Sequence, residues 1–182
     1  MVYLLDPAKA LLPQLQREVE KEVKQNRPEY IVVTTTQADI AHQFSFPDIT
    51  TIVVFFPDGE EFDSEQYHKV KEKLESENIQ TLIGEHIIDS LYHSRSGKFR
   101  TLFPAEIMAA TTAGLSASIK RCIESAVLVV DRKLVPPRSR VLAVAGSNKL
   151  PDTALLIEPK ESRNMLDSKI LKIICHPYQG DF

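Results

Sequence analysis

Glycine is scarce in this sequence, and the few glycines stand apart from one another. Only 6 of the 182 residues are glycine, and no G-x-G pair occurs. Without such a pair the dinucleotide-binding fingerprint cannot be written, and no Gly-x4-Gly-Lys phosphate loop is present either. Two common phosphate-binding motifs of α/β proteins are therefore excluded.

Cysteine is also scarce, and tryptophan is absent. The two cysteines, Cys122 and Cys175, lie far apart in the sequence and form no C-x-x-C motif. We interpret them as two buried free thiols of a protein that resides in a reducing cytoplasm.

The chain further lacks an excess of positive charge, a long apolar run and a signal peptide. Lys and Arg number 22 against 25 Asp and Glu, which gives a formal net charge of -3, whereas nucleic-acid binding relies on clustered basic side chains. No run reaches the roughly 18 apolar residues of a membrane span, and the N-terminus has no basic start. We therefore expect a cytoplasmic protein, a single domain over residues 1–182, that binds neither nucleic acid nor a membrane.

What the sequence does contain is an alternation of β-branched runs and amphipathic segments. Six short apolar runs predict strands at residues 30–33, 50–56, 79–83, 140–145, 153–157 and 171–175. Helical spacing of apolar side chains predicts long helices over about 13–26, 63–77 and 116–131. Two shorter helices are expected over 86–92 and 104–114.

This alternation is typical of an α/β protein. We expect a three-layer α/β/α sandwich around a mixed, mostly parallel sheet of about six strands. The link between the fourth and fifth strands, residues 146–152, is too short for a parallel crossover, so the fifth strand should run antiparallel. The loops after the first four strands then gather at one edge of the sheet, where open α/β proteins bind ligands.

The C-terminal third carries a family resemblance. The stretches 141–146, 151–159, 164–167 and 173–177 resemble a small prokaryotic family of stand-alone domains related to the C-terminal domain of pyruvate kinase. The resemblance implies a fold like that domain, with strand order 3-2-1-4-5-6. It implies no kinase activity, because the catalytic barrel is missing. It also implies a phosphorylated, nucleotide-like ligand at the edge described above, such as the cofactor flavin mononucleotide.

Two loops depart from the family pattern. The loop after the first strand, residues 34–39, contains no glycine, where the family typically has one. The exit of the second strand is Phe56-Pro57-Asp58, where the family often has Tyr-His. The pocket of this chain should therefore differ in shape from that of its relatives.

Candidate ligand-binding residues lie in the loops at this edge. Thr34, Thr35, Thr36 and Asp39 follow the first strand, where hydroxyls and unpaired amides at the start of a helix could hold an anion. The alternative is a threonine-rich strand end that caps a helix. The loop after the fourth strand could form the second side of the ligand-binding site. Alternatively, it is an ordinary tight turn. Its candidate residues are Gly146, Ser147, Asp152 and Thr153.

Two further candidates follow the third strand. His86, close to Gly84, is a candidate ligand-binding residue and the one candidate for acid/base catalysis. A basic loop that follows could clamp a phosphate or could simply be solvated. Its cations are Arg95, Lys98 and Arg100.

Other groupings do not support a catalytic or metal site. His86 and His93 are two helical turns apart, about 10.5 Å, so they cannot bind one zinc ion directly, and we expect no metal. No serine occupies a G-x-S-x-G elbow, and Cys175-His176 has no visible base or oxyanion donor.

Three functions therefore stand as hypotheses. The first is the binding of a phosphorylated small molecule, such as flavin mononucleotide, a nucleotide or a sugar phosphate. The second is a flavin-dependent or phosphoryl-handling enzyme that uses the same edge. The third is a protein-interaction module with a degraded pocket. A homo-oligomer is compatible with each, because the helical segments between 104 and 131 exceed what one face of the sheet requires.

Overall fold

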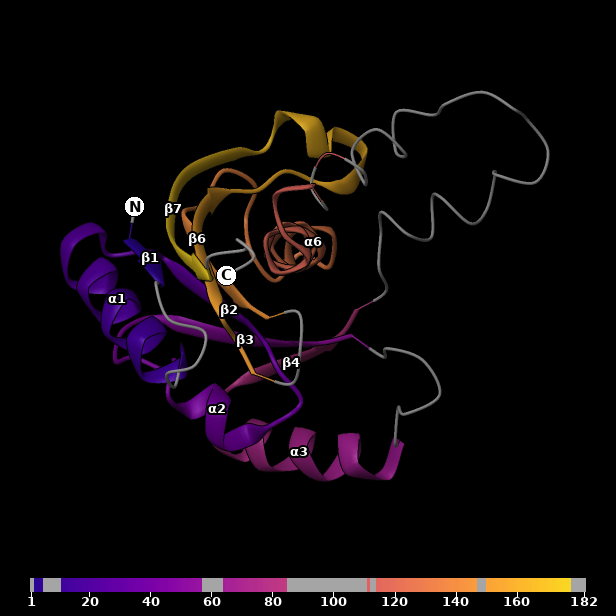
Figure 1. Ribbon diagram of the computed structural model, residues 1–182. Helices are drawn as coiled ribbons and strands as arrows, with labels where there is room; N and C mark the ends of the chain where they lie inside the picture. The colour runs from indigo at the N-terminus through magenta and orange to yellow at the C-terminus, as the bar shows by residue number, and fades with distance from the viewer. Residues whose placement is uncertain are drawn as a thin grey trace.

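The computed structural model describes residues 2–4, 11–56, 64–84, 111, 114–146 and 150–177. These residues form one seven-stranded sheet with helices on both faces (Figure 1). The strands are β1 (Val2–Leu4), β2 (Tyr30–Thr34), β3 (Thr50–Phe55), β4 (Gln80–Ile83), β5 (Val141–Ala145), β6 (Thr153–Glu158) and β7 (Lys169–Pro177).

The sheet has the order β1-β7-β6-β5-β2-β3-β4. All neighbouring pairs are parallel except those of β6, which runs antiparallel to both β5 and β7. The six predicted strands, β2 to β7, thus lie in the predicted order 3-2-1-4-5-6, and the antiparallel fifth strand is confirmed. The short β1, which pairs with the end of β7 at Cys175–Pro177, was not predicted.

Five helical segments accompany the sheet in the described part of the chain. They are α1 (Leu11–Asn26), α2 (Ala38–His42), α3 (Ser64–Ser76), α6 (Ala117–Asp131) and the 3-10 helix η2 (Ser162–Asp167). The three long predicted helices correspond to α1, α3 and α6. A helix after the first strand was expected without bounds and corresponds to α2, whereas η2 was not predicted. The helices expected over 86–92 and 104–114 fall almost wholly outside the described residues.

The two faces of the sheet have different helices. One core cluster joins α1 and α2 to alternate residues of β2, β5 and β6, including Ile31, Val33 and Leu142. A smaller cluster on the same side joins α2 and α3 to β3. The other cluster packs α6 on the intervening residues, such as Val32, Ile52 and Ala143. This alternation follows from the two-residue period of a strand, and it produces the predicted three-layer sandwich (Figure 1).

The helix α6 lies against the middle of the sheet and is buried on nearly all sides. It begins where Ser116 accepts hydrogen bonds from the amides of Ser118 and Ile119, the usual role of an N-cap serine. Its buried positions include the polar Glu124 and Ser125. The close packing extends to Gly84, where a Cβ atom would lie 2.7 Å from Leu128 Cδ2 of this helix.

Candidate functional site

The exits of β2 and β5 lie side by side at the carboxyl edge of the sheet. These two strands are adjacent and parallel, with Val33 opposite Val144. From β2 the chain continues toward β3 and β4, whereas from β5 it continues toward β6 and β7 on the opposite side. The connections therefore diverge between β2 and β5, which is the topological switch point where open α/β sheets leave a crevice.

The three threonines after β2 have different surroundings at this point. The hydroxyl of Thr34 is buried and has no hydrogen-bond partner among the described residues. Thr35 Oγ1 accepts the amide of Gln37 at 3.2 Å, so it already closes a local turn before α2. Thr36 is exposed. Of the three hydroxyls, the one on Thr34 is therefore the one that is buried without a partner, a state that calls for a ligand or a water molecule.

The wall formed by the β5–β6 connection is tightly folded. A Cβ atom on Gly146 would lie 2.0 Å from the carbonyl oxygen of Leu150, so the turn itself occupies the space beside this glycine. Gly146 was expected to let a ligand approach the backbone closely. In the structure, the backbone of its own loop fills the space that a side chain at Gly146 would occupy. Asp152 donates its amide to Ala145 at 3.0 Å, and its Oδ1 accepts the hydroxyl of Thr153 at 2.8 Å.

Both Asp152 and Thr153 are buried, at 8% and 0% exposure. Their mutual hydrogen bond satisfies the Thr153 hydroxyl and leaves the second carboxylate oxygen of Asp152 for other contacts. The side chain of Asp152 therefore lies buried next to the switch point.

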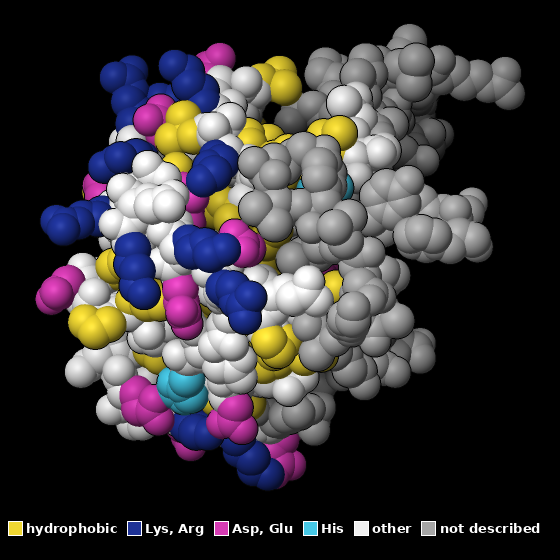
Figure 2. All heavy atoms as spheres, turned by 60° about the vertical axis from the view of Figure 1, so that its left-hand side comes forward, with side chains coloured by type: hydrophobic (Ala, Val, Ile, Leu, Met, Phe, Trp, Pro, Cys, Tyr) yellow, Lys and Arg dark blue, Asp and Glu magenta, His cyan; other side chains and the backbone are white. Residues whose placement is uncertain are grey.

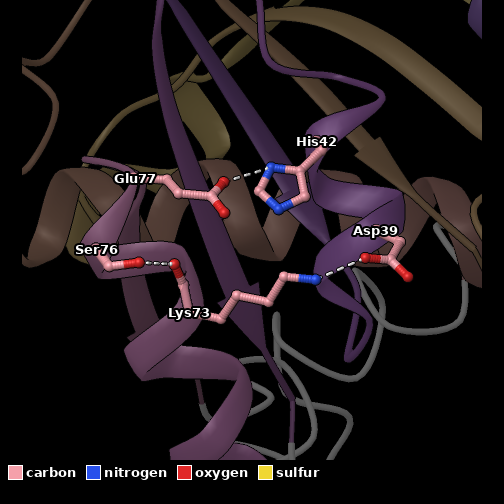
Figure 3. A network of polar contacts seen from close by, with 5 residues as sticks. All are labelled: Asp39, His42, Lys73, Ser76 and Glu77. Atoms are coloured by element: carbon pink, nitrogen blue, oxygen red, sulfur yellow. Dashed lines mark hydrogen bonds and ion pairs between the residues drawn. The ribbon is translucent and has the colours of Figure 1, made fainter.

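Asp39, expected in the same site, belongs to a different set of contacts (Figure 3). Its Oδ1 accepts a hydrogen bond from Lys73 of α3 at 2.8 Å, and this bond lowers the pKa of the Asp39 carboxyl and raises the pKa of the Lys73 amine. His42 Nδ1 lies 3.1 Å from Glu77 Oε2. The two pairs connect α2 with α3 on the outside of the molecule.

The structure brings to this edge a cation that the sequence reasoning missed. Arg121, in the first half of α6, donates from Nη1 to the carbonyl of Gly146 at 3.0 Å. Because α6 connects β4 to β5 in a parallel crossover, its N-terminus has to lie at the carboxyl edge. The signal for Arg121 was therefore present in the predicted element order. The amides of Ser118 and Ile119, by contrast, are occupied by the Ser116 hydroxyl.

The two cysteines are buried free thiols, as predicted. The Cys122 thiol lies 3.6 Å from the carbonyl oxygen of Ala143 and 3.8 Å from that of Thr153. Burial, with a contribution from Asp152, raises the Cys122 pKa well above its ordinary value. Burial, with a contribution from Glu18, raises the pKa of Cys175 to about 12. Both thiols are therefore protonated at neutral pH and are poor nucleophiles.

Five predicted site residues lie outside the described residues: His86, Ser147, Arg95, Lys98 and Arg100. Within the described ranges no three His, Cys, Asp or Glu side chains are grouped so that they could hold a metal ion. Among the same residues no helix combines the length and the apolar character that crossing a bilayer requires.

An open depression of about 510 Å³ lies at the opposite end of the sheet, beside the start of β4. Its lining residues are Glu75, Asn78, Ile79, Gln80, Thr81 and Leu134. Because β4 begins there, this depression is separate from the carboxyl edge.

Comparison with known proteins gives only weak similarity. No family model matches the chain. Among solved structures, the chain is similar to the NH3-dependent NAD synthetase from Campylobacter jejuni subsp. jejuni NCTC 11168 in complex with the nitrate ion, with 11% sequence identity and a TM-score of 0.36. The match covers 72% of this chain and 53% of that enzyme, so the chain spans about half of the enzyme's length. Similarity this low says nothing about what the chain binds.

Proposed function

We propose that the protein binds a phosphorylated small molecule at the carboxyl edge of its sheet, between the exits of β2 and β5. The ligand classes that fit the proposal are flavin mononucleotide, a nucleotide and a sugar phosphate. The observation that carries it is the buried, unpartnered hydroxyl of Thr34 at the switch point of the sheet.

The charges around Thr34 support an anionic group there. Period-two alternation places Thr34 on the same face as Val32, which packs in the α6 cluster. Arg121 is on α6, and its contact with Gly146 holds its guanidinium at the exit of β5. A hydroxyl donor and a guanidinium on one face of the crevice form a suitable pair for a phosphate monoester.

Matched pairs of ligands test the proposal. Isothermal titration calorimetry would compare flavin mononucleotide with riboflavin, AMP with adenosine, and glucose 6-phosphate with glucose. We expect at least one phosphorylated member to bind at least tenfold more tightly than its unphosphorylated partner. Failure of all phosphorylated members to bind, or equal binding within every pair, would overturn the proposal.

Two variants locate the site. Thr34→Val removes the hydroxyl while keeping the shape of the side chain, and it should weaken binding of the phosphorylated ligand about tenfold. Thr50→Val is the matched control, because Thr50 begins β3 at the opposite edge and is exposed. Equal effects of the two substitutions would place the ligand elsewhere.

A further inference from the structure

The end of the sheet opposite to the candidate site has cations without ionic partners. Arg27, Arg132, Lys133, Arg138, Arg140 and Lys160 form no ion pair with any residue in the described ranges. All are exposed except Lys160, which is half-buried. By contrast, Lys69 pairs with Glu65 and Lys71 pairs with Glu75 on α3.

Backbone hydrogen bonds show that these cations share one surface. Glu29, two residues after Arg27, donates its amide to the carbonyl of Arg140 at 3.0 Å, and Arg138 donates to the carbonyl of Pro159 at 3.3 Å. The amide of Ser162 donates to Asp131 Oδ1 at 2.9 Å, which joins the end of α6 to the same place. Four separate segments of the chain therefore contribute to one basic surface at the amino ends of β2 and β5.

Three nearby carboxylates are hydrogen-bonded or paired, and they keep their negative charge. Asp131 accepts the amide of Ser162, Glu29 accepts the amide of Arg140, and Glu161 pairs with Arg163. Residues 131–140 carry four cations against the single carboxylate of Asp131, so this segment has a local excess of positive charge although the whole chain has a formal net charge of -3.

Among these cations, Arg138 has an unfavourable backbone conformation that no helix end explains. Arg27, Lys133 and Arg138 have positive φ angles of 43°, 58° and 73°. The first two follow the C-termini of α1 and α6, where a cation is favourable next to the helix dipole. Arg138 does not follow a helix. It is the third residue of a turn closed by the Ser139 amide and the Pro136 carbonyl, and this position prefers glycine or asparagine.

Apolar side chains border the same surface. Leu166 of η2 is 72% exposed, and Ile170 and Leu171 at the start of β7 are 42% and 43% exposed. They adjoin Lys160, whose amide donates to the Ser168 hydroxyl. Figure 2, which brings the left-hand side of Figure 1 forward, shows Lys and Arg side chains in dark blue interspersed with Asp and Glu side chains in magenta and hydrophobic side chains in yellow.

We propose that this basic surface and its apolar border form a docking site for an acidic segment of another protein that also carries apolar side chains. The cations supply charge complementarity for carboxylates, and Leu166, Ile170 and Leu171 supply contacts for aliphatic groups. Nucleic acid would satisfy the cations but would offer no aliphatic side chain to the border. A second copy of the chain docking through the same surface would place like charges against each other.

Synthetic probes test the proposal. Fluorescence anisotropy would measure binding of a labelled peptide of Glu and Leu, with versions that have Gln for Glu or Ser for Leu, a single-stranded RNA, and vesicles containing phosphatidylserine. We expect the Glu/Leu peptide to bind most tightly, the Gln version not to bind, and binding to weaken as salt rises.

Paired variants locate the contact. The double change Arg138→Gln and Arg140→Gln should weaken binding of the Glu/Leu peptide about tenfold. Lys69→Gln with Lys71→Gln removes the same charge from α3 and should have little effect. Leu166→Ser should weaken binding of the Glu/Leu peptide but not of its Ser version.

Each contrary result would indicate a different occupant of the basic surface, or none, and would overturn the proposal. Tighter binding of RNA or of vesicles than of the Glu/Leu peptide would point to a nucleic acid or a membrane. A dimer in analytical ultracentrifugation that the Arg138/Arg140 variant dissociates would point to a second copy. No binding by any probe, or equal losses in the α3 control, would leave the cations as solvated side chains.

Discussion

The buried thiols show how one side chain responds to its surroundings. Cys122 and Cys175 are both fully buried, and burial raises the pKa of each, to about 12 for Cys175. A raised pKa means that the folded state favours the protonated thiols. Their contribution to the free energy of unfolding is therefore fully present at neutral pH. It is lost as pH rises above the pKa of an unfolded thiol, about 8.5, toward that of the folded one.

The first prediction follows from these thiols. At pH 8, iodoacetamide should leave both cysteines of the native protein unmodified over hours and should modify both at once in urea. Mass spectrometry of the intact protein measures the result. Rapid modification of either cysteine in the native state would contradict the burial described here.

The two restricted turn residues, Gly146 and Arg138, predict opposite effects on stability. Gly146→Ala would place a Cβ atom 2.0 Å from the backbone oxygen of Leu150, and a backbone atom cannot rotate away as a side chain can. The free energy of unfolding should fall by about 2–3 kcal/mol. Urea denaturation measures the free energy of unfolding. If Gly146→Ala loses no more of it than the control Ala145→Ser, the backbone of the turn can shift to make room for the Cβ atom.

Arg138→Gly should instead raise stability. The substitution relieves the φ of 73° at a turn position that glycine prefers. Part of the gain is offset because glycine makes the unfolded chain more flexible, so a net increase of about 0.5–1 kcal/mol is expected in thermal unfolding. A decrease would mean that the arginine side chain makes a stabilising contact that outweighs its strained backbone.

At the scale of elements, α1 is fixed to the edge of the sheet by a largely buried ion pair. Glu22 of α1 is 1% exposed and contacts Lys172 of β7. It also accepts a hydrogen bond from Asn26 at 2.6 Å. The pair lies where β7 leaves its regular register with β6, between Leu156 and Ile157, and it therefore helps to hold this irregular strand against α1.

A double-mutant cycle on this pair gives the next prediction. Lys172→Met leaves the Glu22 carboxylate buried with only Asn26 as partner and should reduce the free energy of unfolding by about 1–3 kcal/mol. Glu22→Gln together with Lys172→Met should recover part of this loss, because no buried charge remains. Urea denaturation of Lys172→Met, of Glu22→Gln alone and of the double variant decides it, and additive losses would argue against a specific pairing.

The elements also differ in how well sequence reasoning located them. β2, β3 and β5 were predictable because each is a continuous β-branched run buried on both faces. β1 was missed because three residues are too few for any period, and it is held by pairing with β7 rather than by its own sequence. The bounds of the five-residue α2 were missed for the same reason of length.

At the scale of the whole molecule, the two ends of the parallel strands have different chemistry. The carboxyl edge holds Thr34, Arg121 and the β5–β6 turn, whereas the amino edge holds the unpaired cations. One sheet thus separates a candidate small-molecule site from a candidate docking surface. Ligand binding between β2 and β5 involves the two central strands, so it should stabilise the whole fold rather than one segment.

This placement gives a prediction for thermal unfolding. A ligand present at about one hundred times its dissociation constant should raise the free energy of unfolding by about 2.7 kcal/mol. For a protein of this length the midpoint temperature should rise by roughly 5–10 °C. Differential scanning calorimetry measures the shift, and Thr34→Val should reduce it while Thr50→Val should not. A ligand that binds without moving the midpoint would have to bind the unfolded chain as well.

The sequence by itself determined the class of the fold, the six main strands, their order and the antiparallel fifth strand. The class, the strands and the antiparallel fifth strand follow from local causes, namely the apolar period of each segment and a link too short for a crossover. It also determined that both cysteines are buried free thiols.

Only the tertiary structure decided which side chains meet. Asp39 pairs with Lys73, 34 residues further along the chain, Arg121 reaches the exit of β5, and the space beside Gly146 is filled by its own loop. The cations at the amino edge come from segments between Arg27 and Lys160. Such neighbours depend on how strands and helices pack over long sequence separations, and hydrophobic periodicity, which is local, does not encode them.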